Sequence, residues 1–154
     1  MKENLLILNK VLDMARELIY QDESPFAAGL LIEGSLYFAG NRCRTGRNPN
    51  LHAEIVCINE FCKQHDHHIL EKAIIFSSCE PCLMCLHTIY NSGIRHIIYA
   101  ASIDDAIKYG SGDDCIHIVE YVKKMNMNMT IEGPLLSEYA SEIFKECITH
   151  RGEL

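Results

Sequence analysis

The stretch that decides the fold is IIFSSCEPCLMC, residues 74–85. It begins with an apolar run over 74–76 that has the character of a buried strand. Pro81 then favours the first turn of a helix, which should continue to about Asn91. A further apolar run over 97–101 follows that helix. Strand, helix and strand at this spacing predict a parallel βαβ unit.

The segments before this unit extend it into an α/β domain. Over residues 5–19 apolar side chains recur at alternating steps of three and four, which predicts an amphipathic helix. The apolar runs 27–32 and 36–39 predict two strands joined by a tight hairpin at Gly34 and Ser35. Because both runs are apolar throughout, we expect the sheet to be covered on both faces.

Helices and strands also alternate in the rest of the chain. We expect helices over about 52–65 and 137–149 and a strand over about 127–132. Methionine occupies every second position over 125–129, which fits a strand with one apolar face. No repeats, linkers or low-complexity tracts interrupt the sequence, so we expect a single domain over residues 1–154.

Composition limits the class of partner and the cellular compartment. The net charge of −7 provides no overall positive field for nucleic acid or anionic membranes, which favours a small neutral or cationic substrate. The apolar run over 5–8 is too short for a signal peptide or a membrane span. We therefore expect a cytoplasmic protein without membrane contact, with reduced thiols and some of its eight Cys able to bind metal.

Two local patterns carry the chemistry: His52-Ala53-Glu54, and further along the chain Pro81-Cys82-Leu83-Met84-Cys85. Cys82 and Cys85 are three positions apart at the start of the expected helix, so their side chains share a face. The positive end of the helix dipole lowers the cost of thiolates there. Both helices start from loops at strand ends, which is where open α/β sheets bind ligands.

One His and two Cys make three protein ligands for a zinc ion. A structural zinc site usually closes with four ligands, whereas a catalytic site leaves a position for water. Zinc lowers the pKa of bound water to about 7, and Glu54 could remove its proton as a general base. The alternatives are a zinc knuckle that only holds the fold, or thiols that pack as small hydrophobic groups. Cys79 could be a fourth ligand, although a Cys that ends a buried strand is more often simply packed.

The combination of His-x-Glu with Pro-Cys-x-x-Cys resembles the signature of the zinc nucleobase deaminases. Through it the chain is similar to the cytidine and deoxycytidylate deaminase superfamily over roughly residues 25–116. The resemblance implies a three-layer α/β/α sandwich around a mixed five-stranded sheet. It also implies one Zn²⁺ per chain held by His52, Cys82 and Cys85, Glu54 as the proton shuttle, and a homodimer.

Within that superfamily the chain most resembles the guanine deaminases of bacteria. The similar segments are Pro25-Phe26, residues 78–82, residues 84–86, Ile89-Tyr90 and residues 99–101. This resemblance implies that Asn41, eleven residues before His52, contacts the base. It also implies that the acidic pair Asp113-Asp114 reads the 2-amino edge of guanine, with Asp114 accepting the protons.

Several of these residues also have a structural interpretation. Asn41 could be an ordinary turn residue, and Asp113 and Asp114 could form a helix cap or a polar turn. Phe26 and Ala53 are expected to contact the substrate, although Phe26 would suit the core equally well. Compared with guanine deaminases, the chain is one residue longer between Asp105 and the acidic pair, and its C-terminal tail lacks the aromatic residues that those enzymes use to close their pocket.

The leading hypothesis is hydrolytic deamination of a nucleobase or related amino-heterocycle, with guanine converted to xanthine and ammonia. The alternative is adenosine-to-inosine deamination of tRNA, because those enzymes share Asn41 and residues 52–55 and 80–82. The acidic balance counts against it. Cytosine, cytidine, nucleotide and triazine substrates stay open, as does a zinc scaffold without turnover.

Arginines at positions 42, 44 and 47 are either solvated or phosphate contacts, and the histidine-rich tract 65–68 is expected to be solvated.

Overall fold

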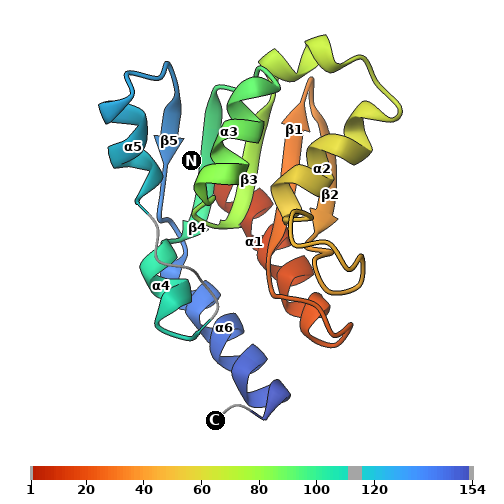
Figure 1. Ribbon diagram of the computed structural model, residues 1–154, viewed down its shortest axis with the longest axis vertical. Helices are drawn as coiled ribbons and strands as arrows, with labels where there is room; N and C mark the ends of the chain where they lie inside the picture. The colour runs from red at the N-terminus through yellow and green to blue at the C-terminus, as the bar shows by residue number, and fades with distance from the viewer. Residues whose placement is uncertain (1, 111–115, 153–154) are drawn as a thin grey trace.

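The computed structural model describes residues 2–110 and 116–152. The elements follow one another along the chain as α1 (Lys2–Ile19), β1 (Ala27–Ile32), β2 (Ser35–Gly40), α2 (Ala53–Cys62), the short 3₁₀ helix η1 (His67–Lys72), β3 (Ile74–Cys79), α3 (Leu83–Asn91), β4 (His96–Ala101), α4 (Ile103–Ile107), α5 (Ile118–Lys124), β5 (Thr130–Glu132) and α6 (Ser137–Arg151). Figure 1 shows this order from red to blue.

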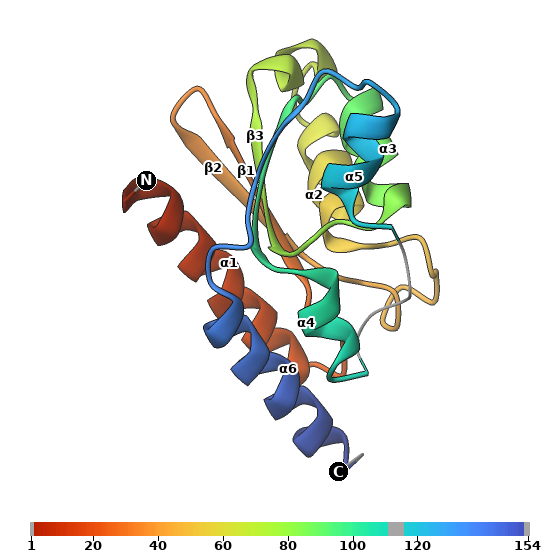
Figure 2. The ribbon, with the colours of Figure 1, turned by 90° about the vertical axis from the view of Figure 1, so that its left-hand side faces the viewer.

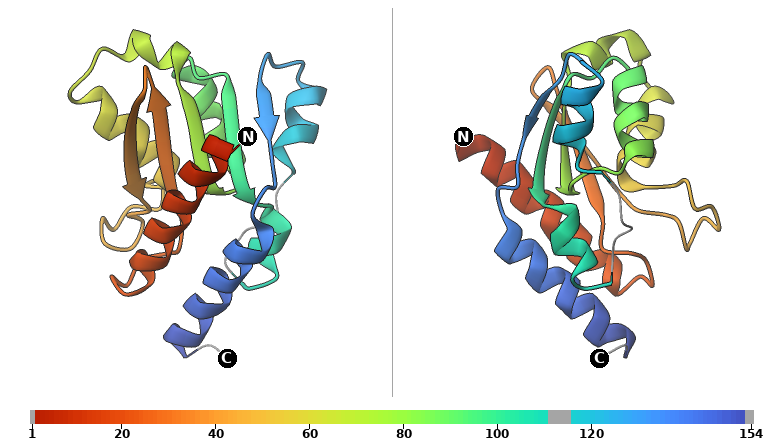
Figure 3. Two further views of the ribbon diagram at one scale, coloured as in Figure 1. Left: turned by 180° about the vertical axis from the view of Figure 1, so that it is seen from behind. Right: turned by 60° about the vertical axis from the view of Figure 1, so that its left-hand side comes forward.

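The strands form one mixed five-stranded sheet in the order β2-β1-β3-β4-β5. Strand β1 is antiparallel to both β2 and β3, whereas β3, β4 and β5 run parallel. Helices α1 and α6 cover one face, and α2, α3 and α5 cover the other (Figures 2 and 3). The expected α/β/α sandwich around a mixed sheet is thus confirmed.

The central strands are buried on both faces, which explains their continuous apolar sequences. Successive side chains of a strand point to opposite faces. Accordingly, Ile75 and Ile97 enter the core beneath α2 and α3, whereas their neighbours Phe76 and Ile98 enter the core beneath α1 and α6. All four side chains have no exposed surface. The prediction of a sheet covered on both faces is confirmed for these strands, while β2, at the edge, is only partly buried.

The hairpin between β1 and β2 differs from its prediction by one residue. Ile32 pairs with Ser35, so the two loop residues are Glu33 and Gly34, not Gly34 and Ser35. Both loop residues have positive φ angles, +47° and +80°. A two-residue turn of this kind twists the chain as the flanking strands require. Gly34 takes the second turn position, and Ser35 becomes the first residue of β2.

Helix ends also depart from the sequence estimate. Helix α2 covers Ala53–Cys62 and is shorter than expected, and α3 begins at Leu83 rather than at Pro81. The alternating methionines precede β5 instead of lying in it: Met125 caps α5, and Met127 and Met129 pack against the core from a non-strand segment. Within the described ranges, none of the helices combines the length and the apolar character that crossing a bilayer requires.

Candidate active site

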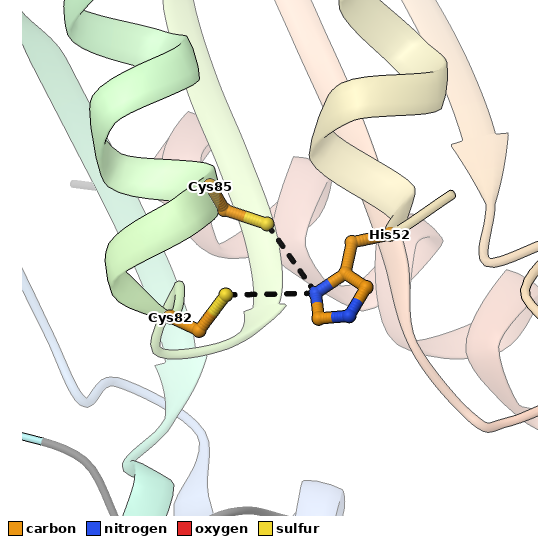
Figure 4. A group of neighbouring side chains, drawn as sticks. All are labelled: His52, Cys82 and Cys85. Carbon is orange, nitrogen blue, oxygen red and sulfur yellow. Dashed lines mark hydrogen bonds between the residues drawn. The ribbon is translucent and has the colours of Figure 1, made fainter. Parts of the chain in front are cut away.

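The two motif-bearing helices, α2 and α3, lie side by side with their N-terminal ends next to each other. His52 is the N-cap of α2, and Cys82 is the N-cap of α3, directly after the turn that leaves β3. Both residues have extended backbone angles, and neither side chain caps its own helix. Cys85 is one turn further along α3 and points to the same side as Cys82 (Figure 4). Three side chains from two helices therefore converge on one point.

The converging side chains have the spacing of a zinc site. His52 Nδ1 lies 3.6 Å from Cys82 Sγ and 3.4 Å from Cys85 Sγ. A tetrahedral zinc ion with its usual bond lengths would separate a nitrogen and a sulfur ligand by roughly 3.6 Å. One imidazole and two thiols are also a donor set that zinc prefers. These three residues can hold the ion as the sequence predicted.

The site already favours a thiolate before any metal is considered. A hydrogen bond from Cys85 and a further one from His52 outweigh burial and lower the pKa of Cys82 to about 4. The same hydrogen bond, together with burial and the nearby carboxyl of Glu54, raises the pKa of Cys85. These opposite shifts favour ionisation of the Cys82 thiol over that of Cys85. A cation is the natural complement of such a pair.

Glu54 lies beside the donor set and is not part of it. Its Oε1 accepts a hydrogen bond of 2.7 Å from Ser77 Oγ, and its Oε2 accepts one of 3.3 Å from Cys85 Sγ. The side chain is buried, and this burial raises the pKa of the carboxyl group above its usual value. A raised pKa makes a carboxyl group a better proton acceptor, as a general acid-base catalyst requires.

These residues open into a pocket of about 450 Å³, a size suited to a small ligand. His52, Glu54 and Cys82 line it together with three residues that the sequence assigned to substrate binding: Phe26, Asn41 and Ala53. Phe26 also packs on Phe144, with ring centroids 5.7 Å apart, so it serves the core and the pocket at once. The acidic pair Asp113 and Asp114 lies outside the described residues.

The family described as "Cytidine and deoxycytidylate deaminase zinc-binding region" matches residues 1–101 of the chain. The chain belongs to this family. A guanine deaminase of Bacillus subtilis (strain 168) is 36% identical over 94 residues, which span 60% of this deaminase and 60% of the relative. A tRNA-specific adenosine deaminase of Streptococcus pyogenes serotype M18 is 26% identical over 146 residues, 94% of this chain and 89% of the relative.

Among solved structures, the deaminase fold is similar to a guanine deaminase from Nitrosomonas europaea with a TM-score of 0.79. The two are 27% identical, and the match covers 92% of this chain and 82% of that one. The matched family is defined by a zinc-binding region, and His52, Cys82 and Cys85 lie within the matched residues. One Zn²⁺ per chain of this deaminase follows from the two findings together.

Sequence reasoning did not assign several pocket residues to the site, among them Glu80, Arg151 and Cys43. Glu80 lines the pocket and accepts hydrogen bonds from the backbone N–H groups of Ile103 (3.2 Å) and Ile118 (2.8 Å), at the starts of α4 and α5. Arg151, in the last turn of α6, also lines the pocket and donates to the carbonyl of Glu23 (3.3 Å). Cys43 lies at the wall beside Asn41. The partners of Glu80 and Arg151 are remote in sequence, so no local pattern points to these two residues.

Several other polar residues of the deaminase have structural partners. Cys79 donates its thiol proton to the carbonyl of Ser102 (3.4 Å), as expected of a packed Cys rather than a fourth ligand. Arg42 pairs with Glu60 (3.0 Å), and Arg44 pairs with Asp22 (3.4 Å). Of the tract 65–68 that was predicted to be solvated, positions 66–68 are exposed, whereas His65 is half-buried and stacks on Phe61 with ring centroids 4.5 Å apart.

Proposed function

We propose that residues 1–154 act as one zinc-dependent hydrolytic deaminase that converts guanine to xanthine and ammonia. One observation carries this proposal: the buried carboxyl of Glu54 touches a His, Cys and Cys donor set inside a pocket that also contains Asn41. The similarity to guanine deaminases from two bacteria supports the choice of base.

His52, Cys82 and Cys85 would hold the zinc ion. When bound, zinc supplies Lewis acidity that makes water nucleophilic near neutral pH. Glu54 moves the protons. Its Oε1 is held by Ser77, which leaves Oε2, the oxygen nearer the donor set, to exchange protons with water and substrate.

The reaction consumes one water molecule, and Glu54 transfers both of its protons. The carboxylate takes a proton from water as the new C–O bond forms at the ring carbon that carries the amino group. It returns that proton to the adjacent ring nitrogen. A second proton, from the new hydroxyl group, then passes through Glu54 to the amino nitrogen as the C–N bond breaks, and ammonia leaves. Asn41, Phe26 and Ala53 would hold the base in place during these transfers. A role of Asp113 and Asp114 at its 2-amino edge stays a prediction.

A second candidate function is deamination of adenosine in tRNA. It is favoured by the tRNA-specific adenosine deaminase of Streptococcus pyogenes, which aligns over 94% of this chain. Two features count against it. The net charge is −7, and two of the arginines before His52 are paired with carboxylates. Nucleic-acid binding generally relies on clustered positive charge.

A substrate panel tests these functions directly. Ammonia release would be measured from the zinc-loaded protein with guanine, guanosine, adenine, cytidine, deoxycytidylate and tRNA. We expect guanine to be the preferred substrate. A preference for tRNA or a cytidine compound would replace guanine as the substrate, and silence across the panel by a protein with stoichiometric zinc would indicate a scaffold.

A further inference from the structure

Behind Asn41 lies a buried carboxylate outside the proposed proton pathway. Glu23 stands in the turn between α1 and β1, and only 1% of its surface is exposed. Its Oε1 accepts from Asn41 Nδ2 (2.8 Å) and from the Ser24 amide (2.9 Å). Its Oε2 accepts from the amides of Arg44 (3.0 Å) and Thr45 (2.9 Å) and from Thr45 Oγ1 (3.0 Å). Donors therefore surround both oxygens.

This ring of donors keeps Glu23 ionised. Burial alone would raise the pKa of its carboxyl group, but the hydrogen bonds from Thr45, Ser24 and Asn41 together lower the pKa below its usual value. An ionised carboxylate accepts hydrogen bonds and donates none. Any side chain that contacts Glu23 must therefore turn a donor toward it.

The orientation of Asn41 follows from this requirement. The amide of Asn41 can meet a carboxylate only with its nitrogen, so Oδ1 is turned away from Glu23. Among the described residues, Oδ1 receives only a weak 3.4 Å contact from the Cys43 thiol, and Cys43 lines the same pocket as Asn41. A carbonyl oxygen is thereby left as the acceptor that Asn41 offers on the pocket side.

We infer that Glu23 is a positioning residue: it fixes the amide of Asn41 so that the site selects heterocycles that present an N–H donor to Oδ1. Lactam and amino-substituted rings have such a donor. A ring edge that presents an unprotonated nitrogen would instead place one hydrogen-bond acceptor against another, Oδ1 of Asn41, and would bind less well. This inference rests on the proposed function, because it takes Asn41 to be a substrate contact. It adds the polarity of that contact and the residue that sets it.

The inference can be tested by exchanging donor and acceptor in the hydrogen bond between Asn41 and Glu23. In Glu23→Gln the new amide can face Asn41 with its nitrogen, and Asn41 would then turn its own nitrogen toward the pocket. We expect KM for the preferred base to rise up to about tenfold, because the base loses one hydrogen bond to the neutral Asn41 amide, with kcat changed much less. Asn41→Asp alone brings two carboxylates together and should weaken binding at least as much.

The double variant Glu23→Gln/Asn41→Asp gives the decisive result. Its introduced glutamine can donate to its introduced aspartate, which again leaves an acceptor toward the pocket, so KM should return to within about threefold of the parent. Thr45→Val is the matched control, because it removes a hydrogen bond to the other oxygen of Glu23 and spares Asn41. If Thr45→Val raises KM as much as Glu23→Gln, or if the two single effects simply multiply in the double variant, Glu23 only supports the loop.

A readout without turnover separates this inference from the proposed function. In the parent protein, NMR should show one Asn41 side-chain amide proton shifted downfield and slow to exchange, as expected for a buried bond to a carboxylate. Thr45→Val should keep this signal. An ordinary, rapidly exchanging amide would overturn the inference even if Glu23→Gln failed to fold. If guanine were not deaminated but the signal were present, the proposed substrate would fail and the positioning role would stand.

Discussion

At the scale of single residues, the proposed chemistry depends on Glu54 keeping its two oxygens in different environments. Ser77 holds Oε1 at 2.7 Å, and Oε2 faces the thiol of Cys85. The carboxyl group is thus fixed in orientation without being a member of the donor set. Burial, which raises its pKa, suits it to proton transfer rather than to permanent ion pairing.

Replacing Glu54 should separate catalysis from metal binding. In Glu54→Ala we expect kcat to fall at least about a hundredfold, because a general acid-base catalyst usually contributes that much or more. Zinc content should stay at one ion per chain. Ammonia release and elemental analysis measure the two effects, and Glu60→Ala, which removes a half-exposed carboxylate on the same helix, is the control. Loss of zinc from Glu54→Ala would mean that the residue is a ligand.

Sequence was sufficient for the residues whose positions are set locally. His52, Cys82 and Cys85 sit at helix starts, so motif spacing alone brought them toward one crevice. Glu23 and Glu80 could not be recognised in the same way. Their roles come from contacts with residues 18 to 38 positions away, which exist only after the sheet and helices have assembled.

At the scale of elements, α2 and α3 each contribute ligands from a first turn. No covalent link joins these helices within the described residues, and the ion would connect them. Metal binding that requires the folded arrangement adds directly to folding stability. A chelator should therefore lower the Tm of the zinc-loaded protein.

Cys82→Ala should reproduce the chelated state. We expect its zinc content and Tm to fall together, and we expect the chelator to lower its Tm no further. Scanning calorimetry with and without chelator measures this. Cys62→Ala, an exposed thiol on α2, should behave as the parent protein. An unchanged Tm on full removal of zinc would contradict the structural role of the ion.

The start of α5 should respond to pH through His117. Its Nδ1 donates to Glu80 (2.9 Å), and its Nε2 lies 3.4 Å from the carboxylate of Asp104. The bond to Glu80 outweighs burial, and with the charges of Asp104 and Glu120 it raises the pKa of His117 above 6.5. The folded protein therefore binds this proton more tightly. The stabilisation is complete below about pH 6.5 and is lost as pH rises through the folded pKa.

Substituting His117 should reveal that window. The difference in Tm between the parent and His117→Gln should be larger at about pH 6 than at about pH 8.5. The same substitution at His68, which is exposed, should give a small difference at both values. A difference that grows with increasing pH would show that the proton is bound more weakly in the folded state.

At the scale of the whole molecule, the layer architecture was predictable and the exact ends of its elements were not. Hydrophobic periodicity reports which faces are buried, and it indicated both central strands and both covering layers. The hairpin was misplaced by one residue because Gly34 is compatible with either turn position, and the pairing of Ile32 with Ser35 decides between them.

Homodimerisation stays a prediction from the family resemblance. Sedimentation should show a particle of twice the 17.5 kDa chain mass.

The salt dependence of kcat/KM should distinguish the two candidate substrates, guanine and tRNA, because they differ in charge. A neutral base carries no phosphates, so its kcat/KM should change less than about twofold between 50 and 200 mM salt. A tRNA substrate would release counterions on binding, and its kcat/KM should then fall steeply over the same range. With a charge of −7, we further expect excess tRNA not to inhibit guanine deamination. Salt-sensitive competition by tRNA would instead locate a basic surface that the overall charge conceals.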